Sequence, residues 1–350
     1  MKIAFIIPSL ANQGPVIVVK DLINELIKKV DHIDVYYFDE NPELKLACTT
    51  TRISFREKIK FDDYDIIHTH MLRPDLYIWY HSKSVNRAKC VSTLHQDIFQ
   101  NLKSSYNFLI AAIFEKIWIE SLKSKQAIVT LTHTMRNQYA KKIKVSKLHT
   151  IYNGRPFFQF DELKEIDEMD KKEIIKLKKK YKIIGISALL TKRKGIAQII
   201  MALPYLNDFA LIVIGNGKEK DNLVKLAANL KISHKILFLG YRLEAIRYFK
   251  FFDFYAMSSY SEGFPLSLLE AGNASLPTLC SNIPIFKELF SKNEVSFFEL
   301  DDVKSLVNSI INLEKNSEMF SQNIYKKVNK LYSVNNMSEN YLLLYEKMLK

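Results

Sequence analysis

Short apolar runs alternate with longer segments of helical periodicity along most of the 350-residue chain, and this alternation constrains the fold more than any other feature. It is typical of βαβ units, whose strands form a parallel sheet. An apolar run at residues 2–8 precedes a segment with apolar residues at 16, 19, 22, 23, 26, 27 and 30. We therefore predict a strand followed by a helix over residues 16–30.

The pattern continues through the first half of the chain and then starts again. Further strands are predicted in the first half at residues 33–38, 65–70, 90–95, 127–132 and 148–153. In the second half they are predicted at residues 181–187, 209–215, 235–240, 253–259 and 277–282, with helices over 195–203 and 218–230.

The stretch 160–180, FDELKEIDEMDKKEIIKLKKK, is highly charged and nearly free of strand-forming residues. It is interpreted as a surface helix or linker, and the domain boundary is placed near it. A chain of this length exceeds one ordinary core. We predict an α/β protein with two Rossmann-like, parallel-sheet domains over residues 1–165 and 175–335.

In doubly wound sheets, ligands bind where loops leave the carboxyl ends of the strands. The loop after the first strand, SLANQGPVIVV, holds a single glycine, Gly14, and lacks the Gly-x-Gly-x-x-Gly pattern. A dinucleotide-dependent dehydrogenase is therefore disfavoured. One glycine still allows the backbone to approach a ligand at the start of the following helix.

The segment SSYSEGFPLSLLEAGNASLP, residues 258–277, places two carboxylates around an expected helix start. Pro265 favours the first turn of a helix, so Glu262 falls in the preceding loop and Glu270 more than one turn inside. Free amide groups at a helix start attract phosphate. These amides are expected at Gly263, Phe264 and Leu266.

The two acids cannot bind that phosphate themselves, because like charges repel. An ionised carboxylate only accepts hydrogen bonds, and paired sugar hydroxyls are suitable donors. A nucleoside-diphosphate sugar has hydroxyl-bearing rings on both sides of its diphosphate. The arrangement predicts one acid for each ring.

Glu262 and Glu270, with seven residues between them, resemble the E-x7-E signature of family-4 glycosyltransferases of the GT-B fold. The segments TKRKG, VIGNGKEKDNL, LFLGYRLE, IYNG and NQGP resemble other parts of this family. The resemblance implies that Glu262 contacts the donor hexose and Glu270 the ribose. It also implies that Arg193 and Lys194 bind the diphosphate.

By the same resemblance, the chain would be a retaining, metal-independent hexosyltransferase without a cofactor, with a UDP-sugar favoured as donor. The acceptor would be a saccharide, notably a lipid-linked glycan of capsule, O-antigen or another surface polysaccharide. The last segment, residues 336–350, would cross back onto the first domain. Two alternatives remain open: a GT-B sugar-nucleotide 2-epimerase and a non-catalytic nucleotide-sugar-binding protein.

Three histidines lie at predicted strand ends in the first half. His68 and His70 share one face of a strand, but no third metal ligand is apparent nearby, so structural hydrogen bonding is the favoured role. His95 ends the next strand, and the resemblance places a histidine beside the donor sugar there. We therefore include His95 with Glu262 among the candidate catalytic residues.

A formal net charge of +13 is compatible with nucleic acid, an anionic membrane or phosphate-bearing substrates as partners. No nucleic-acid recognition module is apparent. The cysteines, Cys48, Cys90 and Cys280, are widely spaced, which favours a reducing cytoplasm.

The apolar segment 107–125 has two alternative interpretations. It is either a helix packed in the first domain or a shallow interfacial helix whose Trp118 and basic residues meet lipid headgroups. The second alternative would make the protein peripheral on the inner face of the plasma membrane.

Overall fold

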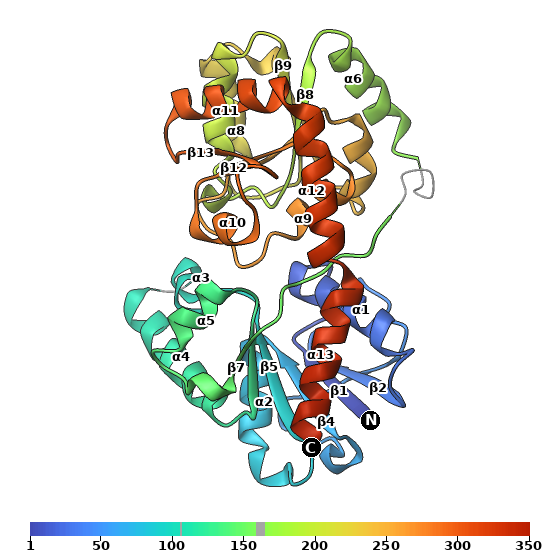
Figure 1. Ribbon diagram of the computed structural model, residues 1–350. Helices are drawn as coiled ribbons and strands as arrows, with labels where there is room; N and C mark the ends of the chain where they lie inside the picture. Colours follow the sequence, from blue (N-terminus) through green and yellow to red (C-terminus); the bar gives the residue numbers. More distant parts are fainter. Residues whose placement is uncertain (106, 159–164) are drawn as a thin grey trace. The chain divides into compact units, whose positions relative to one another are not determined.

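The computed structural model describes residues 1–105, 107–158 and 165–350, which form two compact units. Unit 1 comprises Met1–Pro156 and Tyr332–Lys350, and unit 2 comprises Phe157–Leu331 (Figure 1). The divisions thus fall at 156/157 and 331/332, whereas the sequence placed them at 165–175 and 335. Residues 159–164 of the expected linker region lie outside the described residues.

Unit 1 is built on a parallel sheet with the strand order β3-β2-β1-β4-β5-β6-β7. Its strands are β1 Lys2–Ile7, β2 His32–Tyr37, β3 Thr49–Arg52, β4 Ile66–His70, β5 Lys89–Leu94, β6 Ala127–Thr130 and β7 Leu148–Thr150. Its α-helices are α1 Gly14–Leu26, α2 Leu72–Tyr80, α3 Ile98–Ser105, α4 Phe108–Lys123, α5 His133–Tyr139 and α13 Val334–Leu349.

Unit 2 repeats the design with a parallel sheet in the order β10-β9-β8-β11-β12-β13. Its strands are β8 Lys182–Ser187, β9 Phe209–Ile214, β10 Ile236–Gly240, β11 Phe254–Met257, β12 Thr278–Ser281 and β13 Ser296–Phe298. Its α-helices are α6 Glu168–Lys178, α7 Ile196–Ala202, α8 Lys220–Asn229, α9 Leu266–Asn273, α10 Pro284–Leu289, α11 Val303–Lys315 and α12 Ser317–Leu331.

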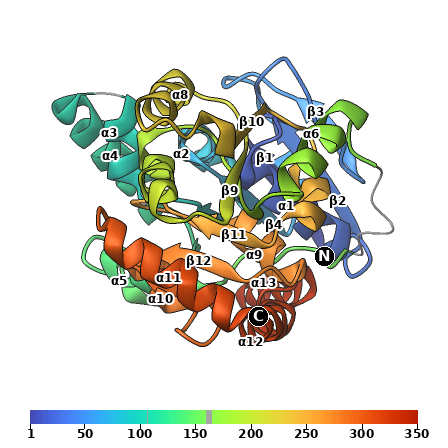
Figure 2. The same cartoon turned by 90° about the horizontal axis from the view of Figure 1, so that it is seen from above.

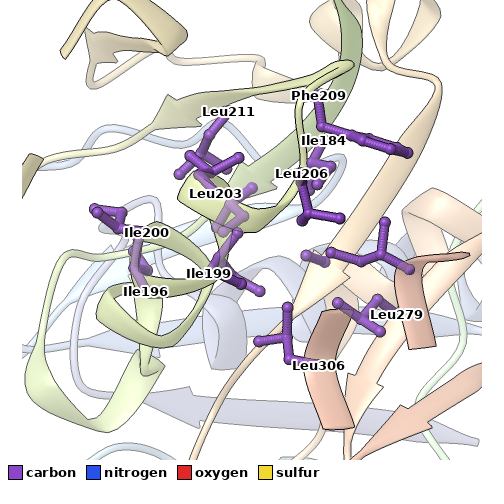
Figure 3. Packing of buried hydrophobic residues seen from close by; sticks show 14 of the residues in the cluster. Ile184, Ile196, Ile199, Ile200, Leu203, Leu206, Phe209, Leu211, Leu279 and Leu306 are labelled. Atoms are coloured by element: carbon purple, nitrogen blue, oxygen red, sulfur yellow. The ribbon is translucent and has the colours of Figure 1, made fainter. Parts of the chain in front are cut away.

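The core of unit 2 lies where α7, α8 and α11 cover one face of the sheet (Figure 2 and Figure 3). Alternate strand residues point to each face, and those on this face, such as Ile184 and Leu211, pack against Ile199 and Leu306. Helix α9 lies on the other face, because the Ser267 hydroxyl reaches Met257 of β11. This layering leaves the carboxyl ends of β8 and β11 to carry loops.

The predicted strands all occur, and two short strands were missed. The four residues of β3 are exposed, so they carry no alternation of apolar and polar residues. Strand β13 is three residues long. The first predicted helix ends at Leu26 rather than at Val30. In the described residues no helix combines the length and apolarity needed to cross a bilayer.

Candidate active site

The strand order of unit 2 reverses between β8 and β11, which pair with each other. In open parallel sheets such a reversal is where ligands bind. The loops 188–195 and 258–265 leave the two strands there and are bound to each other. The Tyr260 amide donates to the Arg193 carbonyl at 2.8 Å, and the Ser258 hydroxyl donates to the Lys194 carbonyl at 2.9 Å.

Gly195 is required where these loops meet. Its φ is +60°, in the left-handed region, and a Cβ there would stand 2.0 Å from the Ser258 carbonyl oxygen. The side chain of Gln198 donates to the same oxygen at 2.9 Å. The side-chain oxygen of Gln198 accepts a hydrogen bond from the Asp301 amide at 2.8 Å. The short basic turn Lys192–Lys194 is therefore held firmly against the loop that contains Glu262.

Glu262 is the centre of a buried ion cluster. Its side chain is 6% exposed, and its carboxylate lies 2.6 Å from Lys194 Nζ and 3.1 Å from Arg193 Nη1. The Ser259 hydroxyl donates to it at 2.6 Å. Burial opposes ionisation, but the charges of Lys194 and Arg193 outweigh it and hold the pKa of Glu262 below its usual value. Glu262 is therefore an anchored carboxylate at neutral pH.

Lys194 and Arg193 differ in how much of each side chain is exposed and available to bind a ligand. Lys194 is 16% exposed and is directed at Glu262, whereas Arg193 is 49% exposed. Arg193 Nη1 also donates to the Ser261 carbonyl at 2.6 Å. Within the described part of the chain, the other guanidinium nitrogens of Arg193 have no partner. They remain free to bind an anion in a planar, bidentate manner.

Helix α9 begins at Leu266, one residue after the proline expected to open it. The Leu266 amide donates to the Phe264 carbonyl at 3.1 Å, so the prediction that this amide is free for phosphate is wrong in this structure. The tight turn at Pro265 brings these two groups together. In the described residues the Gly263 amide has no partner, while the Phe264 side chain is buried.

Glu270 lies in α9 and is partly buried. Burial raises the pKa of the Tyr255 hydroxyl, and the carboxylates of Glu270 and Glu262 both add to that rise. Both acids are thus within electrostatic range of one buried hydroxyl of β11. Behind α9, a Cβ on Gly272 would lie 2.4 Å from the Val328 side chain, so α12 packs directly on this helix.

In unit 1, the strand order reverses between β1 and β4. Gly14 opens α1 after the β1 loop, as expected, and the Gln13 carbonyl accepts the amides of Val16 and Ile17. The Gln13 side chain does not cap the helix. The start of α1 therefore has a glycine and no cap from the Gln13 side chain.

The three predicted histidines stack in a row at the ends of β4 and β5. Ring centroids are 4.2 Å apart for His68 and His70, and 5.1 Å apart for His70 and His95. His70 Nδ1 lies 2.7 Å from His95 Nε2. His68 is hydrogen-bonded at 2.7 Å to the Tyr345 hydroxyl of α13 and at 2.8 Å to Thr93. The row therefore joins the strand ends to the last helix of unit 1.

Burial keeps the histidine row neutral. It lowers the pKa of His68 and of His95 to about 3, with the neighbouring His95 adding to the effect on His68, and it lowers that of His70 well below the usual value. His95 Nδ1 hydrogen-bonds to no described residue. Among the described residues, no three His, Cys, Asp or Glu side chains are grouped so that they could hold a metal ion.

Comparison with known proteins identifies both units. Residues 167–330 match the family model of the glycosyl transferases group 1, and residues 13–156 match that of the glycosyltransferase family 4. The chain belongs to the family-4 glycosyltransferases of the GT-B fold. It is a glycosyltransferase.

Curated relatives of this glycosyltransferase include the O-antigen biosynthesis glycosyltransferase WclY of Escherichia coli. It is 29% identical over 365 residues, covering 100% of this chain and 99% of the relative. A second relative, the UDP-Gal:alpha-D-GlcNAc-diphosphoundecaprenol alpha-1,3-galactosyltransferase of Escherichia coli, is 24% identical and covers 79% of this chain and 73% of the relative.

Solved structures share the fold of this glycosyltransferase. Anabaena HepE in complex with UDP and glucose superposes with a TM-score of 0.80 at 16% identity, covering 99% of this chain and 100% of that chain. Sucrose-phosphate synthase from Thermosynechococcus elongatus gives a TM-score of 0.81 at 16% identity, covering 99% of each chain. These likenesses establish the GT-B architecture.

Several residues of this site in the glycosyltransferase could not be predicted from the sequence. Ser259 and Gln198 fix the loop that holds Glu262, but isolated serines and glutamines carry no distinctive signal. The Thr191 hydroxyl is buried without a described partner beside the basic turn, where an anion would satisfy it. Its position next to the basic residues of the TKRKG segment was the one available indication.

Proposed function

We propose that this glycosyltransferase moves a hexose from a nucleoside-diphosphate sugar, with UDP favoured as the nucleotide, to a saccharide acceptor. The observation that carries the proposal is the buried Glu262 carboxylate held by Lys194 and Arg193 at the strand switch point of unit 2. It combines an acceptor for sugar hydroxyls with donors for a diphosphate.

In the proposed reaction, the diphosphate leaves with increasing negative charge. Arg193, Lys194 and the Gly263 amide stabilise that charge because they are fixed before the reaction begins. Glu262 accepts hydrogen bonds from the donor hexose, and Glu270 from the ribose. With cations and amides in this role, the reaction needs no metal ion or cofactor.

Retention of the anomeric configuration is proposed because this chain is a family-4 glycosyltransferase. The acceptor hydroxyl would attack from the side that the diphosphate leaves, without a covalent nucleophile from the protein. Unit 1 would supply the acceptor side. Two residues of unit 1 are proposed to contact the donor: Gly14, which allows close approach to the start of α1, and His95, which offers Nδ1 to the donor sugar while Nε2 stays bonded to His70.

The acceptor is proposed to be a lipid-linked glycan of a surface polysaccharide, with O-antigen as the first candidate. WclY is named for O-antigen biosynthesis, and the galactosyltransferase relative is named for a diphosphoundecaprenol-linked acceptor. Three free cysteines support a cytoplasmic location. Such an acceptor would be met at the inner face of the membrane.

The proposal is tested by screening nucleotide sugars for thermal stabilisation of the full chain and then measuring transfer or donor hydrolysis with each hit. Arg193→Ala and Lys194→Ala should each weaken binding of bare UDP by roughly tenfold, the loss of one charge-assisted contact. Lys192→Ala is the matched control, since that lysine occupies the same basic turn but its side chain is exposed and has no described partner.

Unchanged UDP affinity in both variants would place the diphosphate elsewhere. If the protein converts the donor sugar to its C2 epimer without an acceptor, it is an epimerase and not a transferase. Donor binding without turnover on any acceptor would leave only the binding function.

A further inference from the structure

His70 lies among other rings of unit 1. It is buried beside His68 and His95, with ring centroids at 4.2 Å and 5.1 Å, and the Phe5 ring centroid lies 6.0 Å away. Its Nδ1 atom lies 2.7 Å from His95 Nε2. Its other nitrogen, Nε2, is buried and has no hydrogen-bond partner among the described residues. His70 therefore has one bonded and one unbonded ring nitrogen.

The neighbouring His68 does not supply the missing partner. Its Nδ1 is bonded to the Tyr345 hydroxyl at 2.7 Å, and its Nε2 is bonded to the Thr93 hydroxyl at 2.8 Å. Both nitrogens of that ring are thus occupied, one toward α13 and the other toward β5. In the part of the chain that the structure describes, His95 is the one hydrogen-bond partner of the His70 ring.

The strands that carry the histidine row are fixed from the opposite face of the sheet. Thr69, which precedes His70, hydrogen-bonds to the buried Asp75 side chain. The Ser92 hydroxyl of β5 donates to the same carboxylate at 2.9 Å, and the Trp118 indole nitrogen donates to it at 2.7 Å. The expectation that Trp118 meets lipid headgroups is therefore wrong, because its ring is 3% exposed and faces the interior.

The bond between His70 and His95 has two possible directions, because a neutral imidazole has one N–H and one lone pair. Burial lowers the pKa of both rings and keeps them neutral. If His95 donates from Nε2, the proton of His70 must lie on its own Nε2, where it is a buried N–H without a described acceptor. If His70 donates from Nδ1, its Nε2 has only an unbonded lone pair.

Donation by His70 costs less than donation by His95. A buried N–H without an acceptor is rarer in proteins than an acceptor that is not filled. When His70 donates, His95 Nε2 accepts, so the proton of His95 must lie on Nδ1. That nitrogen bonds to no described residue, and His95 keeps an exposed fraction of 8%. The Nδ1–H group is therefore available to a ligand.

We propose that His70 is a positioning residue that holds His95 in the Nδ1–H tautomer, so that His95 meets the donor sugar as a hydrogen-bond donor and not as an acceptor. The contact with the sugar rests on the proposed function, whereas the tautomer does not. His70 touches no substrate itself and acts through the His95 ring. The group that His95 recognises is then an oxygen with a lone pair directed at Nδ1–H.

Nuclear magnetic resonance of the full chain labelled with ¹⁵N-histidine reads the tautomers directly. A ring nitrogen that carries a proton differs in ¹⁵N chemical shift from one that carries a lone pair. His70→Asn and His95→Asn identify the signals of the two rings among the eight histidines. At neutral pH both rings should carry their proton on Nδ1. A proton on Nε2 of His95 in the wild type would overturn the proposal.

Transfer by variants of His70 tests the consequence of the tautomer. Asparagine keeps an amide donor near the place of Nδ1, whereas phenylalanine keeps a ring that donates nothing. His70→Phe should lower kcat roughly tenfold, the loss of about one hydrogen bond in the transition state. Its affinity for bare UDP should not change, since UDP lacks the sugar that His95 contacts. His70→Asn should restore most of kcat, which a role in packing alone does not predict.

His68→Phe is the matched control, because it removes another buried imidazole of the row and leaves the bond between His70 and His95. It should lower stability as His70→Phe does, while kcat stays close to that of the wild type. Wild-type kcat in folded His70→Phe, or an equal loss of kcat in His68→Phe, would overturn the proposal. If the His70 variants do not fold, the wild-type spectrum still decides the tautomer, with His95→Asn identifying the ring.

The two measurements also separate this proposal from the proposed function. A wild type that transfers sugar but carries the His95 proton on Nε2 would overturn the tautomer assignment alone. A wild type that shows the expected tautomers and transfers sugar to no acceptor would count against the proposed reaction alone.

Discussion

Glu262→Gln should make bare UDP bind more tightly while it abolishes sugar transfer. In the ligand-free chain the Glu262 carboxylate pairs with both Lys194 and Arg193, which are the proposed diphosphate ligands. The carboxylate therefore competes with phosphate for the same donors and also repels it. Glutamine keeps the shape of the side chain but removes the negative charge.

The size of the effect follows from the geometry. Arg193 Nη1 lies 3.1 Å from the carboxylate, so a phosphate bound by the same guanidinium would stand roughly 7 Å from it. Coulomb's law then gives about 0.6 kcal/mol of repulsion per charge in water and about 2 kcal/mol at an effective dielectric constant of about 20. Because Arg193 is half-exposed, about 1 kcal/mol is appropriate, which corresponds to roughly fivefold tighter UDP binding.

Isothermal titration calorimetry with UDP measures this directly, and an activity assay with the preferred donor measures the loss of transfer. Glu318→Gln, which removes one charge from the exposed start of α12, controls for the change in net charge. Circular dichroism verifies that the variant is folded. An unchanged or weaker UDP affinity in folded Glu262→Gln would refute the view that Arg193 and Lys194 are shared between Glu262 and diphosphate.

Two further predictions concern stability. Burial lowers the pKa of His68 and His95 to about 3. Between about pH 3 and about pH 6.5 the unfolded chain therefore binds more protons than the folded chain, and stability falls as the pH drops through that range. Each buried neutral histidine should lower the free energy of unfolding by about 1 kcal/mol at about pH 5.5. Urea unfolding measured as a function of pH would show this loss. A free energy of unfolding that does not change with pH would contradict the buried neutral row. Gly195→Ala should destabilise unit 2 by about 1–3 kcal/mol, because the residue has positive φ and its Cβ would meet the Ser258 carbonyl. A thermal unfolding midpoint equal to that of the wild type would mean that the loop relaxes.

The sequence was sufficient for the fold because its main signals are local. Alternation of strand and helix periods located both sheets, including the strands that carry the buried residues Ile184 and Leu211. The sequence pattern failed in two places, one where an exposed strand has no apolar alternation and one where the apolar spacing continues beyond the end of a helix. Strand β3 is exposed along its length, and Ile27 and Val30 continue the apolar spacing of α1 although the helix ends at Leu26.

The sequence named the residues of the candidate site but not the contacts between them. The sequence named Arg193, Lys194 and Glu262, yet it assigned the cations to phosphate and the acid to sugar. It did not predict that they pair, because 68 positions separate Lys194 from Glu262 and spacing says nothing about contacts between two loops. It also left the Leu266 amide free, whereas the tight local turn at Pro265 directs that amide to the Phe264 carbonyl.

The pairing implies different duties for the two cations. Lys194 is nearly buried and lies closest to Glu262, so its charge chiefly keeps that carboxylate ionised and in place. Arg193 is half-exposed and uses one guanidinium nitrogen for Glu262 and Ser261, which leaves the rest of its planar fork for an incoming diphosphate. Lys194→Ala should therefore impair stability and transfer in addition to weakening UDP binding, because it also deprives a buried carboxylate of its main partner. Arg193→Ala should weaken UDP binding without a comparable loss of stability.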